Sequence, residues 1–428
     1  MTLRVGIAGL GTVGAGVVKV LRSKRRELVA RAGRDIEIVA ASARDSAKDR
    51  GIDLSGIAWE KDALSLAARS DVDVVVELVG GEEGVARQLV ERALNAHKHV
   101  VTANKALLAH HGKALAASSE RNGVALKFEA AICGGIPIVK ALRESLISYD
   151  IGAVRGILNG TCNFILTQME STGRAFADVL TEAQALGYAE ADPTLDVGGG
   201  DTAHKLCLLA SLAFGTEPDL DGIELTGIQG VRPADIAFAR EFGFRIKLLG
   251  VARRTKDGIE QRVHPAMVRA GTPLAAVGSS FNAVVADAGE AGPFFFEGRG
   301  AGQSPTASAV VSDLVDVARG ALGPAFGRPA AELVAPRRLG SDIRSSAYYL
   351  RFQVLDVPGV MAEISRHLAN EKISIESMLQ RGRAPGEPVA IVMITHDASH
   401  SAVVRALKAI AASDKVSEAP CMIPMEPV

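Results

Sequence analysis

A glycine triplet near the N-terminus constrains the fold more than any other feature of this 428-residue chain. Gly9, Gly11 and Gly14 directly follow a short apolar run and open an amphipathic segment that reaches about Arg31. In a strand–turn–helix unit the first glycine permits the tight turn and the second lets the backbone approach a pyrophosphate. The third lets helix and strand pack closely, and free N–H groups at the helix start bind the phosphates. The predicted dinucleotide site comprises Gly9, Gly11, Thr12, Val13 and Gly14.

The N-terminal third of the chain alternates apolar strands with helices. Residues 71–79 form a near-continuous valine-rich run, which is typical of a strand buried on both faces. Strands that alternate with helices in this way form βαβ units and a parallel sheet. We therefore predict an α/β fold with a doubly wound Rossmann domain over residues 1–150, completed by a helix at about 303–322. The expected strands are 3–8, 36–41, 71–79, 99–102 and 124–129, and the expected helices are about 12–31, 84–95 and 105–121.

The pattern changes after Tyr149. Helical segments come first and strands follow, which predicts an α+β substrate and dimerisation domain over residues 151–300. The Pro/Arg-rich stretch 323–346 is typical of a linker. Residues 347–428 have a complete βαββαβ order of their own, with a polar loop after Gln380. This order predicts an independent ferredoxin-like unit. The expected middle helices are about 162–169, 176–186 and 202–213, and the expected strands are 247–253, 258–263, 283–288 and 294–297, with a turn at Asp257-Gly258.

Composition excludes several classes of protein. A formal net charge of −1 leaves no basic footprint for nucleic acid. No apolar run approaches the roughly 20 residues that span a bilayer, and the first strand begins too early for a signal peptide. The four cysteines are scattered and form no Cys-x-x-Cys pair. We therefore expect a cytoplasmic protein that binds neither nucleic acid nor membrane.

The end of the second strand bears on the choice of cofactor. Proteins that bind NAD usually place an acidic residue there to hold the ribose 2′-hydroxyl. Here the strand ends in small residues, and Arg44 follows, with Asp45 beside it. An arginine can bind a 2′-phosphate, so the sequence favours NADP, and NAD stays possible.

The segment most informative about chemistry is Asp201-x-x-x-Lys205. This spacing places a carboxylate and an amine on one face of a helix. On most helices such a pair is an exposed ion pair, but this helix is apolar almost all round, which predicts a pair that is buried or in a cleft. Burial is expected to lower the pKa of Lys205 and suit it to acid–base work.

The same segment resembles the homoserine dehydrogenase signature. Three further segments resemble that family in the same order, and the likeness covers about residues 1–325. The residues that carry it are Ala183, Gly187, Asp192, Pro193, Asp196, Gly199, Asp201 and Lys205, together with segments 102–105, 129–137 and 156–161.

The resemblance implies reversible, NAD(P)H-dependent reduction of L-aspartate 4-semialdehyde to L-homoserine. Lys205 would be the proton donor, Asp201 would orient it and hold substrate, and Lys105 is the rival donor. Glu190 would bind the substrate ammonium. The other implied residues are Asp196 and Thr161 for substrate, and Thr102, Lys105, Gly187 and Gly302 for cofactor.

The family also implies a monovalent cation and an oligomer. The cation, usually Na⁺, would be bound largely by main-chain carbonyls, which leave almost no trace in a sequence. The corresponding positions are Glu129, Ile132, Gly134 and Ile136. A homodimer would form on the second domain's sheet, and paired C-terminal domains could extend it to a homotetramer.

The C-terminal unit resembles an ACT domain, a module that often binds amino acids. Asp356, Gly359 and Val360 lie where its first strand turns into its first helix, so backbone N–H groups there could bind a ligand carboxylate. The effector expected from the implied pathway is L-threonine, and truncation after about Arg344 should then abolish inhibition and spare catalysis. The alternative is a dimerisation module without a ligand.

Two other functions stay open at this point. An acylating semialdehyde dehydrogenase would need a cysteine nucleophile, for which Cys133 is the candidate. A non-catalytic amino-acid sensor would keep the Rossmann domain for structure alone. Oxidation of homoserine would exclude both. Because the chain starts with the first Rossmann strand, we expect an enzyme without an attached aspartate kinase.

Overall fold

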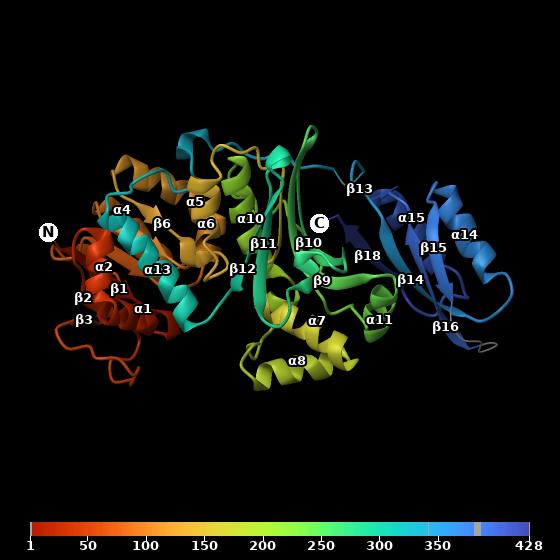
Figure 1. Cartoon of the computed structure of the whole chain (residues 1–428), viewed down its shortest axis with the longest axis horizontal. Helices are drawn as coiled ribbons and strands as arrows, with labels where there is room; N and C mark the ends of the chain where they lie inside the picture. Colours follow the sequence, from red (N-terminus) through yellow and green to blue (C-terminus); the bar gives the residue numbers. More distant parts are fainter. Residues whose placement is uncertain (1, 341, 381–386, 428) are drawn as a thin grey trace.

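The computed structural model describes residues 2–340, 342–380 and 387–427, arranged in three parts along the long axis of the molecule (Figure 1). The polar loop predicted after Gln380 falls on residues 381–386, which lie outside the described ranges. None of the helices formed by the described residues combines the length and apolar character needed to cross a bilayer.

The N-terminal part is a six-stranded sheet in the order β3-β2-β1-β4-β5-β6, and every neighbouring pair is parallel. This is the strand order of a doubly wound dinucleotide-binding fold, so the predicted fold class is confirmed. Helix α13 (Gln303–Ala318) returns from far along the chain and packs on α1, as predicted (Figure 1). The elements are β1 Leu3–Ala8, α1 Thr12–Ser23, α2 Arg25–Ala32, β2 Ile36–Ser42, β3 Ala58–Glu60, α3 Ser65–Ala68, β4 Val74–Glu77, α4 Val85–Asn95, β5 His99–Thr102, α5 Lys105–Arg121 and β6 Leu126–Lys127.

Several details of this part differ from the sequence prediction. Strand β3 and helix α3 were not predicted, and the strand expected at 124–129 is only Leu126–Lys127. The single helix expected to reach Arg31 is two helices, because Lys24 leaves helical geometry at φ −109° and ψ 15°. The strand expected at 71–79 is only Val74–Glu77. It ends there because the Glu77 carboxylate accepts hydrogen bonds from the N–H groups of Val79 and Gly80, which turns the chain out of the sheet.

The middle part is a mainly antiparallel sheet, with the longer helices on one face and the short helix α12 (Pro273–Ala276) on the other. Its strands follow the order β12-β11-β7-β9-β10, and α7 and α8 lie together beside the sheet (Figure 1). The hairpin predicted between β9 and β10 is present, but its turn residues are Lys256 and Asp257, and the strands are longer than predicted. Strand β7 and helix α11 were not predicted. The elements are α6 Ile138–Lys140, β7 Ala153–Ile157, α7 Gly160–Thr172, α8 Phe176–Ala185, α9 Thr194–Val197, α10 Gly200–Phe214, β8 Glu224–Leu225, α11 Pro233–Glu241, β9 Phe244–Thr255, β10 Gly258–Arg269, α12 Pro273–Ala276, β11 Phe281–Asp287 and β12 Pro293–Arg299.

The C-terminal part has the predicted ferredoxin-like order. Four strands form an antiparallel sheet in the order β18-β14-β16-β15, and the buried faces of α14 and α15 pack on it. On α14 the buried residues Val360, Ile364 and Leu368 recur at helical spacing and form the core face. The elements are β13 Ser345–Ser346, β14 Tyr348–Leu355, α14 Val360–Asn370, β15 Ile375–Gln380, β16 Pro388–Thr395, β17 Ala398–Ser399, α15 His400–Ala411 and β18 Cys421–Glu426.

This unit is not independent, contrary to the prediction. Its last strand, β18, pairs with β14 on one side and with β10 of the middle part on the other. The second pairing is parallel and joins Met267 to Met425 and Val268 to Glu426. An isolated unit would leave this edge of β18 unpaired, and pairing with β10 satisfies it. The two sheets are therefore continuous (Figure 1). They comprise ten strands, because the short strand β8 also pairs with β10.

The stretch 323–346 is not a free linker either. The Phe326 ring is buried against Phe128, with 5.2 Å between their centroids. Further along, Arg337 and Leu339 exchange backbone hydrogen bonds of 2.7 and 2.9 Å with Ile259. The polar composition that suggested a linker reflects arginines that pair with carboxylates of the middle part, such as Arg338 with Asp219. The stretch from Phe326 to Leu339 is therefore packed on the first two parts of the molecule.

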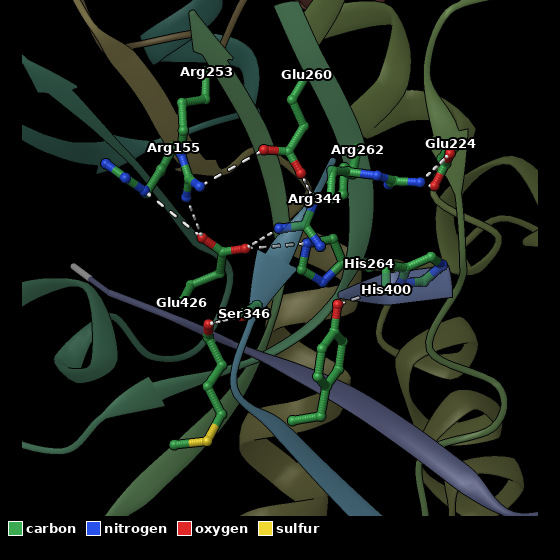
Figure 2. Close-up of polar contacts among 12 residues, drawn as sticks. Arg155, Glu224, Arg253, Glu260, Arg262, His264, Arg344, Ser346, His400 and Glu426 are labelled. Carbon is green, nitrogen blue, oxygen red and sulfur yellow. Dashed lines mark hydrogen bonds and ion pairs between the residues drawn. The ribbon is translucent and has the colours of Figure 1, made fainter. Parts of the chain in front are cut away.

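A buried cluster of charges lies where the C-terminal strand meets the middle sheet (Figure 2). Glu426 has 1% of its side chain exposed, and its carboxylate is 2.5 Å from Nη2 of Arg262 and 3.3 Å from Nη2 of Arg253. Nε2 of His264 is 3.6 Å away and Nε of Arg155 is 3.9 Å away. Burial alone would raise the pKa of Glu426, but the hydrogen bond with His264 and the charges of Arg262 and Arg253 lower it to about 2. The C-terminal part is thus joined to the middle sheet through a buried carboxylate.

Candidate active site

The glycine triplet has the geometry of a phosphate-binding turn. Gly9 has φ +98°, and a Cβ there would be 2.5 Å from the Leu78 carbonyl oxygen. A Cβ at Gly14 would be 2.1 Å from the Gly9 oxygen, so the helix could not approach the strand. Gly11 faces open space instead, and α1 starts after it without a side-chain cap. The first N–H groups of α1 are therefore available to an anion.

A cleft of about 910 Å³ lies beside this turn. It extends from Gly9 and Gly11 to the end of β2, where four cationic and two acidic residues line it: Arg44, Lys48, Arg50, Lys61, Asp45 and Asp62. The Asp45 carboxylate accepts a hydrogen bond from the N–H of Ala47, so it caps its own loop. The lining residues fit a dinucleotide, and the cations fit an additional phosphate at the ribose end.

The second helix N-terminus beside the cleft belongs to α13. Gly302 precedes it with φ +112°. The side-chain amide of Gln303 donates a hydrogen bond of 3.1 Å from Nε2 to the Thr12 carbonyl. This contact places the start of α13 next to the start of α1. The predicted cofactor residues Thr12, Val13 and Gly302 therefore lie at neighbouring helix starts.

Asp201 lies between two lysines that come from different domains. Its Oδ2 is 2.7 Å from Nζ of Lys205, one turn later on α10, and its Oδ1 is 3.1 Å from Nζ of Lys105, the first residue of α5. The exposed side-chain fractions are 8% for Asp201, 12% for Lys205 and 31% for Lys105. The predicted i, i+4 pair is therefore present and nearly buried, and it connects the cofactor domain to the middle domain.

The pKa of Lys205 is shifted in the direction opposite to the one predicted. Burial opposes the charged amine, but the Asp201 carboxylate outweighs burial and raises the pKa of Lys205 above its usual value. Burial would also raise the pKa of Asp201, yet Lys205 and Lys105 hold it well below its usual range. The prediction considered desolvation alone and omitted the paired charge. Lys205 is thus an ammonium at neutral pH, which is the form that can donate a proton.

Two asparagines that sequence reasoning missed organise this cluster. Asn159 donates from Nδ2 to Asp201 Oδ2 and to Asp196 Oδ1, both at 2.8 Å. Asn282 donates from Nδ2 to the Leu158 carbonyl at 2.8 Å, and Lys205 donates to that same carbonyl at 2.7 Å. Asn159 lay within a segment that resembled the family, but Asn282 gave no sequence signal.

The other residues predicted to bind substrate differ in how they are connected to this cluster. The Asp196 carboxylate is joined to Asp201 through Asn159, and burial raises its pKa. The Thr161 hydroxyl donates to the Tyr188 carbonyl at 2.6 Å. Glu190 is exposed in the loop after α8, where its carbonyl accepts a hydrogen bond from Gln184. The structure does not bring the Glu190 carboxylate into the Asp201 cluster.

Two predicted cofactor residues differ in accessibility. Gly187 is exposed with φ +75° at the end of α8. Thr102 is fully buried, and its hydroxyl donates a hydrogen bond of 2.6 Å to the Glu77 carboxylate. The Thr102 side chain therefore fixes the end of β5 and is not free for a ligand.

The loop predicted to hold a cation has an unusual backbone. Cys133 and Gly134 both have positive φ, at +52° and +45°. Within the described ranges, the carbonyls of the buried residues Ile132 and Gly134 accept no hydrogen bond, while those of Glu129 and Ile136 accept one each, from Ile132 and Ile138. Buried carbonyls without donors fit a cation held by main-chain oxygens. No group of three His, Cys, Asp or Glu side chains among the described residues could hold a metal.

Cys133 does not have the environment of a nucleophile. Its side chain is buried, and burial raises the pKa of its thiol. A reactive cysteine needs the opposite shift, toward the thiolate. The structure thus disfavours an acylating dehydrogenase.

The C-terminal unit has a cavity at its first helix start. It measures about 440 Å³ and is lined by Asp356, Gly359, Val360 and Gln380, among others. Gly359 has φ +92° and precedes α14 without a side-chain cap. The three predicted effector residues therefore line one cavity.

A dinucleotide-sized cleft on the first domain, with a protonated lysine on α10 of the middle domain, fits hydride transfer to a carbonyl. The chain is accordingly an NAD(P)-binding oxidoreductase. Family models narrow the class: "Homoserine dehydrogenase" matches residues 137–315, "Homoserine dehydrogenase, NAD binding domain" matches residues 9–129, and "ACT domain" matches residues 348–414. The chain belongs to the homoserine dehydrogenase family.

Relatives and solved structures agree with this assignment. The homoserine dehydrogenase of Neisseria gonorrhoeae is 45% identical over 99% of this chain and 98% of its own length. That of Pseudomonas aeruginosa is 43% identical over 97% and 96%. The structure of a homoserine dehydrogenase from Thiobacillus denitrificans matches with a TM-score of 0.94 at 43% identity and covers 100% of this chain and 98% of that one. The S. aureus enzyme at pH 7.5 matches with a TM-score of 0.78 at 31% identity and covers both chains fully.

Proposed function

We propose that this protein reduces L-aspartate 4-semialdehyde to L-homoserine, reversibly, with NADPH, and that Lys205 is the proton donor. The observation that carries the proposal is the position of Asp201 between Lys205 and Lys105. When bound, the reduced nicotinamide supplies the hydride that reaches the aldehyde carbon. Lys205 then donates its proton to the developing alkoxide oxygen, and in the reverse direction it accepts that proton.

The neighbours of Lys205 prepare it for this role. Two of its three N–H donors are held by Asp201 and by the Leu158 carbonyl, so one is left for substrate. Asp201 keeps the amine protonated because its negative charge offsets the cost of burial. Lys105 adds a second positive charge next to Asp201, and Glu190, Asp196 and Thr161 would bind the polar groups of the amino acid.

NADP is the preferred cofactor in this proposal. Arg44, Lys48 and Lys61 line the ribose end of the cleft, and the Asp45 carboxylate is hydrogen-bonded within its own loop. Cations outnumber carboxylates in this lining, which favours a 2′-phosphate, whereas a single acidic residue there would favour a free 2′-hydroxyl. A monovalent cation, Na⁺, would be bound at the loop of Ile132 and Gly134, with the carbonyls of Glu129 and Ile136.

We also infer that L-threonine binds the C-terminal cavity and lowers activity. Open N–H groups at the start of α14 suit a ligand carboxylate, and the cavity of about 440 Å³ has room for a small amino acid. Binding there would be transmitted to the catalytic sheet through strand β18, which pairs with β14 of the C-terminal unit and with β10 of the middle sheet. The protein would work in the cytoplasm as a homodimer or homotetramer, in threonine, methionine and isoleucine biosynthesis.

The decisive test is a spectrophotometric assay of homoserine oxidation with NAD and with NADP in parallel. We expect homoserine oxidation with at least one of the two cofactors, and a higher kcat/KM with NADP than with NAD. Absence of homoserine oxidation with either cofactor would refute the reaction. A higher kcat/KM with NAD would refute the cofactor preference alone.

A further inference from the structure

Asn282 occupies a position from which it can direct the proton donor. It lies on β11, where its backbone is paired with Gly298 of β12. On the other side of β11, the ladder with β7 ends at the pair Ala283 and Ile157. The Leu158 carbonyl comes directly after that ladder, and the Asn282 side chain donates to it at 2.8 Å. The side chain thus continues the sheet's hydrogen bonding by one residue.

The Leu158 carbonyl is shared between Asn282 and Lys205. Nζ of Lys205 donates to the same oxygen at 2.7 Å, and a carbonyl oxygen has two lone pairs for two such donors. Asn282 therefore fixes the plane of the Leu158–Asn159 peptide. The next residue, Asn159, orients Asp201 through its own hydrogen bond. One peptide thus supports both the donor and its carboxylate partner.

The orientation of the Asn282 amide is determined by these contacts. A flipped amide would place Oδ1 against the Leu158 oxygen, with no proton between them. Oδ1 must therefore point the other way, toward Gly160, where a Cβ would be 3.5 Å from it. Oδ1 is buried, and no donor among the described residues reaches it. Such an orphaned acceptor is costly, and it is tolerated where a ligand supplies the donor or where the other half of the amide is essential.

We propose that Asn282 is a positioning residue for Lys205: by holding the Leu158 carbonyl, it fixes two of the three ammonium N–H groups and directs the third toward substrate. The proposal rests on Lys205 being the proton donor. The loss of this hydrogen bond lets the Leu158 peptide rotate, so Lys205 loses a fixed acceptor and its proton is delivered in a poorer geometry.

The test compares Asn282→Ala with Asn163→Ala in the full-length enzyme. Both asparagines are 1% exposed. Asn163 donates to the backbone carbonyls of Val277 and Phe281. Asn282 donates to the Leu158 carbonyl and, at 3.7 Å, to Sγ of Cys133. The control therefore disturbs the same strand without contacting the Leu158 carbonyl. The measurements are kcat and KM for the semialdehyde, the Kd of NADPH, and the alkaline limb of the pH profile of kcat.

For Asn282→Ala we expect kcat to fall by about ten- to a hundredfold, with a nearly unchanged Kd for NADPH. The alkaline limb should move to lower pH, because an ammonium that loses an acceptor has a lower pKa. Asn163→Ala should leave that limb in place. An unmoved limb in Asn282→Ala, with a kcat no lower than that of Asn163→Ala, would overturn the proposal.

Asn282→Asp provides a second test that does not depend on the stability of the alanine variant. A protonated carboxyl group can donate to the Leu158 carbonyl as the amide does, and an ionised one cannot. The kcat of this variant relative to wild type should therefore rise as the pH falls. A constant ratio would contradict the proposal. If Lys205→Met keeps near-normal turnover, the proposed function fails first, so the two failures are distinguishable.

Discussion

Glu426→Gln tests whether a single buried carboxylate holds the C-terminal unit to the catalytic sheet. The substitution keeps the shape of the side chain and removes its charge, which leaves Arg253 and Arg262 with Glu260 as their remaining carboxylate. The decrease in the pKa of Glu426 from 4.5 to about 2 corresponds to about 3 kcal/mol of folding free energy at neutral pH. Removing one partner of a buried ion pair typically costs about 3–5 kcal/mol, which agrees.

The assay is equilibrium urea unfolding of the full-length chain, with Glu418→Gln as the matched control. Glu418 is also an acidic residue of the C-terminal unit that pairs with an arginine of the middle part, Arg232, but its side chain is 39% exposed. Loss of an exposed pair costs about 1 kcal/mol or less. We therefore expect Glu426→Gln to lower the unfolding free energy by about 3 kcal/mol, and the control to lower it by less than a third of that.

The pH dependence provides an independent check with a defined sign. The folded pKa of Glu426 lies below its unfolded value, so its contribution is complete above about pH 4.5 and is lost as the pH falls toward about pH 2. In Glu426→Gln this part of the acid dependence should be absent. Equal losses for the two variants, or an unchanged acid profile, would refute the role of Glu426. The same contacts mean that truncation after Arg344 would destabilise the catalytic half, so point variants are the better test of regulation.

Two further predictions concern the ligand sites. Arg44→Ala should weaken NADP binding by about 1.5–3 kcal/mol and spare NAD, because one charge-assisted contact to the 2′-phosphate is lost; fluorescence titration with both cofactors measures this, and equal losses would show that Arg44 is not the discriminator. Gly359→Asp should abolish threonine inhibition and leave uninhibited turnover unchanged, since its carboxylate would occupy the open start of α14. Gly271→Asp, at an exposed glycine with a similar φ of +90° and open surroundings, is the control, and inhibition that survives Gly359→Asp would argue against this cavity.

Local patterns predicted the parts of the fold that depend on neighbouring residues. Helix α5 was predicted with its observed limits, Lys105–Arg121, because apolar periodicity within one segment determines it. The Asp201–Lys205 pair was found for the same reason, since four residues separate them on one helix. In contrast, the pairing of β18 with β10 joins residues more than 150 positions apart through only two residue pairs. Such a contact leaves no periodic signal in either strand.

The chemistry of the site was predictable only in part. Residue types and spacing identified Lys205, but the direction of its pKa shift depends on whether burial or Asp201 dominates, which requires the distances. Lys105 comes from a different domain and joined the site through family resemblance alone. Asn282 was missed because a neutral amide in a strand looks like any other polar residue until its partners are known.

The measurement that tests the central claim most directly is the steady-state rate of Lys205→Met beside that of Lys105→Met. If Lys205 is the proton donor, Lys205→Met should lower kcat by roughly 10²–10⁴ and leave the Kd of NADPH nearly unchanged. Lys105→Met should retain more turnover, because Lys105 pairs with the other oxygen of Asp201 and leaves the contact between Asp201 and Lys205 in place. Near-normal turnover in Lys205→Met, together with a large loss in Lys105→Met, would contradict the account and identify Lys105 as the donor.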